Sequence, residues 1–218
     1  LIPATCGFLT LVSCAFSSQP VDDEVRFVVW GDTQFANKPK FERFVHETNM
    51  LNPDFVLQIG DMIQGYTYDH AQVRKEWKIY EAQIEPLTMP FYPVPGNHDV
   101  VTGPSEEVYK EVWGEDKLVY SFDKGSVHCI VLDTYWGEED DTIADWQIDW
   151  VREDLAEYAR LNGGEGSAEL ASKNIFVFMH SPLWRYKSDH PGRQAWDRVH
   201  EILSQYPVKL VAGGHTHE

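Results

Sequence analysis

Five short motifs in this chain combine a backbone that can turn sharply with side chains that could bind a metal or transfer a proton. They are Gly31-Asp32-Thr33-Gln34, Gly60-Asp61, Gly96-Asn97-His98-Asp99, His180-Ser181-Pro182 and Gly213-Gly214-His215-Thr216-His217. Glycine precedes the reactive group in four of the five, and glycine allows backbone conformations that other residues avoid. A mixture of carboxylate, amide oxygen and imidazole suits divalent Mn, Fe or Zn better than Ca.

Taken singly, each motif is weak evidence for a metal site. Gly-Asp and Gly-Asn are common turn dipeptides, and a lone histidine after a strand is more often hydrogen-bonded than bound to a metal. The five gain weight together because each follows a short apolar run, at 25–30, 55–59, 91–94, 174–179 and 208–212. Chance would have to produce the same arrangement at five separate loops.

The apolar runs are rich in β-branched and aromatic residues and are almost uninterrupted, which predicts buried strands. A further strand is predicted at 127–132. It would form a hairpin with 118–122 around Asp123-Lys124-Gly125. Helical spacing of apolar residues predicts helices at 38–51, 70–87, 144–161 and 193–206. Residues 162–169 are predicted to be a flexible surface loop.

This alternation predicts an α/β fold with central, mixed but largely parallel β-sheets flanked by helices. The carboxyl ends of such strands lie along one edge, where ligands bind. We therefore expect the five motifs to converge on a single site.

The series of motifs resembles that of the calcineurin-like metallophosphoesterase superfamily, and the resemblance extends from Val25 to Glu218. It implies a metallophosphoesterase-like α/β sandwich and two divalent metal ions of unknown identity (Mn, Fe or Zn). It also implies a role for each motif residue. Asp32 and His217 would bind the first metal, Asp61 would bridge the two, and Asn97, His180 and His215 would complete the second site. His98 would be the general acid, with Asp99 orienting it.

Three departures from the family pattern bear on this expectation. Gln34 stands where the family has histidine, so it could bind the first metal through its carbonyl oxygen or only hydrogen-bond a bound water. Gln64 stands where purple acid phosphatases have tyrosine, so no tyrosinate–iron(III) site is expected. Family members continue with further strands beyond the last histidine motif. We therefore expect that the chain is C-terminally truncated, that the final strands are missing and that 213–218 is the interior of a loop.

The implied reaction is hydrolysis of phosphate mono- or diesters by a metal-bridging hydroxide, with His98 protonating the leaving group. The 35 acidic residues outnumber the 18 Lys and Arg, for a net charge of −17. This charge repels nucleic-acid polymers and anionic lipid, but two cations would make the site itself locally positive and able to hold a small phosphate ester. The alternative is a non-catalytic metal- or phosphate-binding envelope protein. The intact His98 and Asp99 argue against it, because binding alone needs no acid.

Other candidates are weaker. Trp184 and Arg185 could line the substrate pocket, with Arg185 binding a phosphate oxygen, or could belong to an ordinary surface loop. Residues that end the strand at 127–132 could support the metal ligands or form the rim of the site; they are Asp133, Tyr135 and Trp136. The acidic run 138–141 reads as a solvated loop. The remaining histidines read as solvated or packed; they are His46, His70, His128, His190 and His200.

The N-terminal residues 1–19 are uncharged and contain a short apolar run, which predicts a secretory signal peptide. Leu11-Val12-Ser13-Cys14 resembles a bacterial lipobox, so Cys14 could carry a lipid anchor and place the protein in the cell envelope as a periplasmic-side membrane lipoprotein, or the protein could be secreted. A loose apolar arm or an extra strand is the alternative. Residues 20–24 would be a linker and 25–218 the catalytic domain. Cys129 lies in an apolar stretch and is expected to be inert core.

Overall fold

The computed structural model of the chain describes residues 24–135 and 141–217. The seven strands are β1 (Phe27–Gly31), β2 (Phe55–Ile59), β3 (Phe91–Val94), β4 (Tyr120–Lys124), β5 (Val127–Val131), β6 (Asn174–Phe178) and β7 (Val208–Ala212). The helices are α1 (Lys38–Leu51), α2 (His70–Ile84), α3 (Asn97–Val100), α4 (Gly103–Trp113), α5 (Asp145–Leu161), α6 (Ala168–Ala171) and α7 (Pro191–Leu203). Short 3₁₀ turns lie at Glu115–Lys117 and Leu183–Arg185.

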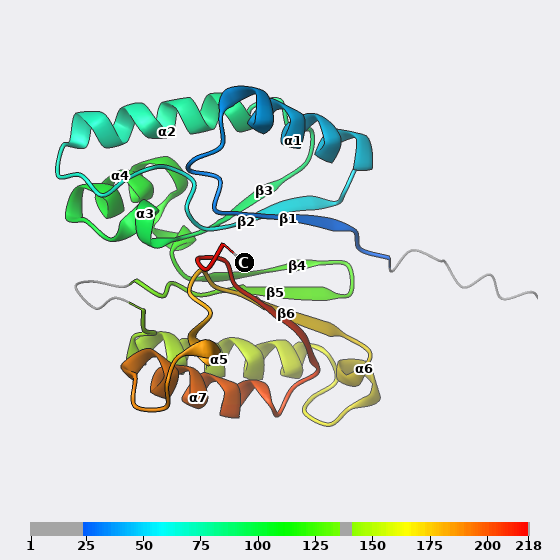
Figure 1. Ribbon diagram of the computed structural model, residues 1–218. Helices are drawn as coiled ribbons and strands as arrows, with labels where there is room; N and C mark the ends of the chain where they lie inside the picture. The colour runs from blue at the N-terminus through cyan, green and yellow to red at the C-terminus, as the bar shows by residue number, and fades with distance from the viewer. Residues whose placement is uncertain (1–23, 136–140, 218) are drawn as a thin grey trace, which may run out of the picture.

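The strands form two sheets that face each other. The first has the order β1-β2-β3 and is parallel throughout. The second has the order β4-β5-β6-β7, in which only the β4–β5 hairpin is antiparallel. Helices α1 and α2 cover the outer face of the first sheet, and α5 and α7 cover that of the second (Figure 1). The prediction of an α/β fold with largely parallel sheets between helices is confirmed.

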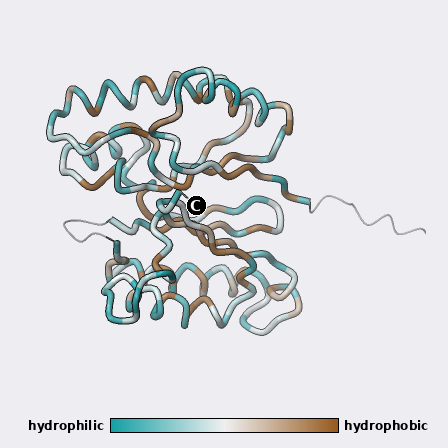
Figure 2. The backbone as a smooth tube through the Cα atoms, in the orientation of Figure 1, coloured by the Kyte–Doolittle hydropathy of each residue, from teal (hydrophilic) through white to brown (hydrophobic). Residues whose placement is uncertain are grey.

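Apolar side chains fill the three spaces between these four layers. Phe55, Leu57, Cys129 and Phe178 are fully buried between the two sheets. Figure 2 shows hydrophobic residues running along the strands and recurring at intervals along the helices, as expected for helices buried on one side. Burial raises the pKa of the Cys129 thiol to about 12, so this cysteine is inert core, as predicted.

Side-chain caps fix where the predicted helices begin and end. The Asn37 side chain accepts a hydrogen bond from the Lys40 N–H at the start of α1, and Asn52 ends that helix in a left-handed conformation with φ 46°. Asp69 caps α2 in the same way as Asn37 caps α1. Asn52 thus ends α1 shortly before β2 begins at Phe55.

The structure differs from the prediction after β3 and after α5. Helices α3 and α4 were not predicted, although Thr102 caps α4 through the Ser105 N–H and a proline occupies its first turn. After α5, residues 168–171 form the short helix α6, which Ser167 caps. This helix overlaps the end of the loop predicted at 162–169. Helices α3 and α6, with four residues each, escape detection by periodicity because they span too few turns.

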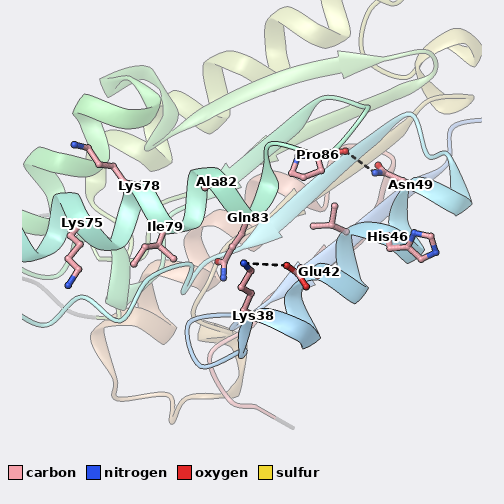
Figure 3. Close-up of a pocket in the computed structure, with 11 residues that line it drawn as sticks. Lys38, Glu42, His46, Asn49, Lys75, Lys78, Ile79, Ala82, Gln83 and Pro86 are labelled. Atoms are coloured by element: carbon pink, nitrogen blue, oxygen red, sulfur yellow. Dashed lines mark hydrogen bonds and ion pairs between the residues drawn. The ribbon is translucent and has the colours of Figure 1, made fainter.

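The predicted signal peptide and lipobox, including Cys14, lie outside the described residues and stay predictions. Among residues 24–135 and 141–217, no helix is long and apolar enough to cross a membrane. A largely apolar groove of about 760 Å³ lies between α1 and α2 (Figure 3), lined in part by Val45, Ile79 and Ala82. None of the predicted metal ligands lines this groove.

Candidate active site

The loops that follow five strands meet at one end of the two sheets, as the motifs predict. The ends of β1 and β2 are tied by a hydrogen bond from the Asp32 N–H to the Gly60 carbonyl, and the His215 N–H donates to the Asp32 carboxylate at 3.0 and 3.2 Å. Four of the predicted ligands have left-handed backbones: Asp32 (φ 52°), Asp61 (56°), His215 (69°) and His217 (54°). Such conformations are costly for residues other than glycine and are found preferentially at functional sites.

The first group of metal-binding side chains consists of Asp32, Asp61 and His217, whose ligand atoms all lie within 4.8 Å of one another. The His217 Nε2 atom is 3.1 Å from Asp32 Oδ1. The Gln34 Nε2 group donates to Asp61 Oδ2 at 3.1 Å. The four residues predicted at the first metal therefore lie together.

The second group consists of Asp61, His180 and His215, again with ligand atoms within 4.8 Å. Asn97 Oδ1 lies 3.0 Å from His180 Nε2 and 3.0 Å from His215 Nδ1. Because Asp61 belongs to both groups, its carboxylate occupies the position that a bridging ligand requires.

The donor set of the second group fits a cation. His180 Nδ1 donates to the Ile59 carbonyl at 2.9 Å, so the neutral ring presents an unprotonated Nε2. That nitrogen faces Asp61 Oδ1 at 3.3 Å and the Asn97 oxygen. The lone pairs of His180 Nε2, Asn97 Oδ1 and Asp61 Oδ1 are thus directed at one point. This arrangement needs either a proton on His180 or a cation between the three atoms. The donors are those that Zn, Mn and Fe accept.

The pKa shifts follow from the same contacts. Burial lowers the pKa of His180, but the hydrogen bond and the charge of Asp61 outweigh it, and the net shift is upward. Burial raises the pKa of Asp61, but its contacts with His180 and His98 lower it overall. Burial and the neighbouring His180 lower the pKa of His215. The lowered pKa keeps the Asp61 carboxylate, which both groups share, ionised at neutral pH.

Gln34 is also compatible with a cation at the first site. The side chain is 8% exposed, and its Oε1 atom has no hydrogen-bond partner among the described residues. Amide oxygen and nitrogen are assigned from hydrogen bonds, so the opposite assignment places Oε1 beside Asp61 Oδ2. In that orientation the carbonyl oxygen faces the first group.

His98 lies beside the Asp61 carboxylate that the two groups share. Its backbone N–H donates to Asp61 Oδ1 at 3.1 Å, and its Nε2 atom is 3.9 Å from Asp61 Oδ2. Its Nδ1 atom donates to the Gln64 carbonyl at 2.5 Å. The ring therefore presents Nε2 to the site, as an acid placed next to the reacting group would.

The predicted role of Asp99 needs correction. Its side chain is completely buried, so it touches no substrate, and the partner of the His98 ring is Gln64 rather than Asp99. Its carboxylate accepts backbone hydrogen bonds from Asp61, Met62 and Gly96 instead. Burial and the charge of Asp61 raise the pKa of Asp99 to about 7. Asp99 holds two loops together and is not a catalytic residue.

A cluster beside His215 was predicted only in part: Tyr135 was expected to support the ligands or form the rim, but Asp141 was not expected to take part. The Tyr135 hydroxyl donates to Asp141 Oδ1 at 2.7 Å and lies 2.8 Å from Ser181 Oγ and 3.4 Å from His215 Nδ1. Ser181 also donates to Asp141. Asp141 was expected to be a solvated carboxylate, but it is half-buried and has a φ of 54°. Trp136 and residues 138–140 lie outside the described residues.

The two candidate substrate residues differ in their surroundings. Arg185 is exposed and donates to Thr216 Oγ1 at 3.3 Å, between the last two histidines of the site. The Trp184 ring packs against Trp196, at 5.5 Å between centroids, and belongs to the core beneath the final loop. Trp184 therefore supports the loop, whereas Arg185 can reach a ligand.

The other histidines stay outside the site. In the described part of the chain, none of them joins a group of side chains able to hold a metal. His70 pairs with Glu107, His190 caps α7, and His128 is buried between two carboxylates. His46 and His200 are exposed on helices.

Comparison with known proteins gives one family. The pattern of the calcineurin-like phosphoesterase family matches residues 25–218. Purple acid phosphatase 23 of Arabidopsis thaliana is 28% identical over 200 residues, 76% of this chain and 41% of that protein. A probable glycerophosphodiester phosphodiesterase GpdQ of Arcobacter nitrofigilis is 23% identical over 190 residues, 83% of this chain and 63% of that protein.

Solved structures agree on the fold. A dimetal phosphatase from Danio rerio superposes with a TM-score of 0.64 at 15% identity, covering 90% of this chain and 82% of that one. At such low identity the likeness concerns the fold alone. The chain spans 41% and 63% of the length of the two curated relatives.

Proposed function

Because this chain belongs to the calcineurin-like phosphoesterase family, we propose that it hydrolyses phosphate mono- or diesters with the help of two divalent cations. The observation that carries the proposal is the sharing of Asp61 by two groups of metal-binding side chains, with His98 beside it. Asp32, Gln34 and His217 would complete the first cation site. Asn97, His180 and His215 would complete the second.

Each residue then has a task. Two bound divalent cations would supply activated water near neutral pH and neutralise charge on the phosphoryl group. Asp61 would hold both cation sites in register. In its doubly protonated form His98 would carry a proton on each ring nitrogen. It would keep the Nδ1–H on the Gln64 carbonyl and give the Nε2 proton to the leaving oxygen. Arg185, beside Thr216, would bind a phosphate oxygen.

The names of the relatives support both ester classes. One is a phosphatase and the other a probable phosphodiesterase. The net charge of −17 disfavours polymeric nucleic acid and favours small esters drawn to the locally positive site.

A binding-only protein is the second candidate. Gln34 favours it, because an amide oxygen is a poorer ligand than the imidazole usual at this position and would weaken the first cation site. In that case the fold would hold a metal or phosphate without turnover.

Metal analysis combined with two assays tests the proposal. Purified protein is dialysed, its metal content is measured, and hydrolysis of p-nitrophenyl phosphate and bis-p-nitrophenyl phosphate is followed with added Mn, Fe or Zn. We expect two metals per chain and turnover of at least one ester. Two bound metals without turnover of either ester would favour the binding-only protein.

A further inference from the structure

Tyr66, in the loop after β2, contacts two predicted site residues. The Asn97 Nδ2 group donates a hydrogen bond to the Tyr66 hydroxyl oxygen at 2.8 Å. The Tyr66 ring also packs edge-on against the His98 ring, with 4.8 Å between centroids and an interplanar angle of 76°. Sequence reasoning passed over this residue because it belongs to none of the five motifs.

The backbone of this loop is built tightly against His98. Gly65 has a φ of +54°, and a Cβ atom there would lie 1.7 Å from the His98 carbonyl oxygen. Tyr66 itself has a φ of 52°, a left-handed conformation that is unfavourable at a residue other than glycine. The preceding Gln64 carbonyl accepts from His98 Nδ1. Residues 64–66 thus contact Asn97 and His98 at three successive positions.

The hydrogen bond with Tyr66 holds the plane of the Asn97 amide in place. Asn97 Oδ1 lies 3.0 Å from both His180 Nε2 and His215 Nδ1, where a ligand oxygen is needed. If the amide turned over, it would present N–H groups to those nitrogens and could not bind a cation. The Tyr66 oxygen accepts the Asn97 N–H on the far side of the amide, and a cation between the histidines would select the oxygen at the near end.

We propose that Tyr66 is a positioning residue of the second cation site, which orients Asn97 through its hydroxyl and supports His98 through its ring. This inference rests on the proposed two-cation function. Partners that orient a metal ligand typically change metal affinity by about 10- to 100-fold when they are removed.

The test compares Tyr66→Phe with Tyr68→Phe. The first variant removes the hydroxyl and keeps the ring. The second makes the same change two residues later on a side chain that is 81% exposed. Melting temperatures establish that both variants fold. Metal titrations with Mn and Zn should then show second-site affinity lowered about 10- to 100-fold in Tyr66→Phe, with the first site retained and both sites unchanged in Tyr68→Phe.

Three results would overturn the proposal. Unchanged affinity in Tyr66→Phe would mean that the hydroxyl does not orient Asn97. Unchanged affinity with a raised KM alone would assign Tyr66 to the substrate. A visible tyrosinate-to-iron absorption in the iron-loaded protein, lost in Tyr66→Phe, would make Tyr66 a ligand. Wild-type protein that binds two metals but hydrolyses neither ester would refute the proposed function, while the affinity comparison would still decide the role of Tyr66.

Discussion

The buried carboxylate of Asp99 accepts a hydrogen bond from the backbone N–H of Asp61 at 2.8 Å. The same oxygen accepts from Gly96 at 3.0 Å, and the other accepts from Met62 and Ile63 at 2.9 and 3.3 Å. Asp99 therefore joins the loop after β2 to the loop after β3. The Asp99 side chain thus helps to fix the position of Asp61 relative to Asn97 and His98.

Replacing Asp99 with Asn should destabilise the fold. The amide keeps one acceptor oxygen but turns an NH₂ group towards two backbone N–H groups. Each buried group left unpaired costs about 1–3 kcal/mol, so we expect a loss of about 2 kcal/mol or more in the free energy of unfolding, measured by urea denaturation.

Asp133→Asn is the matched control for that measurement. Asp133 is buried to the same degree, but its carboxylate accepts from the Tyr135 N–H at the end of a different strand. A smaller loss is expected there. Equal losses of stability in the two variants would mean that the hydrogen bonds from Asp99 to the loop after β2 add no more stability than the single bond of Asp133.

The layers and the meeting point of the motifs could be predicted from the sequence because both follow from local patterns. Uninterrupted apolar runs identified all the parallel strands, and glycine at the strand ends marked the turns. Parallel strands place their carboxyl ends together, so residues as distant in the sequence as Asp32 and His217 could be brought to one site by topology alone.

The contacts that orient the ligands could not be predicted in this way. Asp99 was taken to orient His98 because the two are neighbours in sequence, yet three of the four backbone groups that its carboxylate accepts from lie 36 to 38 residues away. Tyr66 and Asp141 carry no motif, and their roles arise from left-handed loop backbones that depend on tertiary packing. Loop geometry of this kind leaves no periodic pattern.

Substitution of Asp61 and of Gln34 should affect metal binding differently. Asp61→Asn removes the ligand common to both groups, so metal content after dialysis should fall at both sites. Gln34→Ala should lower occupancy of the first site alone. The Gln34 side chain lies beside Asp61 Oδ2, at the edge of the first group of ligands. Inductively coupled plasma mass spectrometry measures both. Full metal content and activity in Asp61→Asn would refute the bridging role.

His128 should make stability depend on pH away from the active site. Its ring nitrogens lie 2.8 Å from Asp123 Oδ1 and 2.8 Å from Asp154 Oδ2. Burial lowers the pKa of His128, but these two hydrogen bonds outweigh it and raise the pKa overall. A raised pKa means that the folded state holds the proton more tightly than the unfolded state. The stabilisation is therefore complete below about pH 6.5 and is lost as the pH rises through the folded value.

Melting temperatures of the wild type and of His128→Gln between pH 5 and 9 check this expectation. The melting temperature of the wild type should exceed that of the variant most at the acid end, because hydrogen bonds to a charged group stabilise the fold by about 2 kcal/mol. The difference should shrink towards pH 9. His46→Gln, an exposed position on α1, is the control. A difference that grows with pH would reverse the assigned sign.

Changing His98 to Asn should separate substrates by their leaving group. A p-nitrophenolate departs without a proton, whereas the alkoxide of an alkyl phosphate needs one, and a general acid supplies about 10²- to 10⁴-fold in such a reaction. Hydrolysis of alkyl phosphates should therefore fall by about that factor, while p-nitrophenyl phosphate loses far less. Metal content should stay unchanged, because the bond to Asp61 comes from the backbone N–H at this position and survives the substitution. If both substrates lost rate equally, His98 would act by binding the phosphate rather than as the acid.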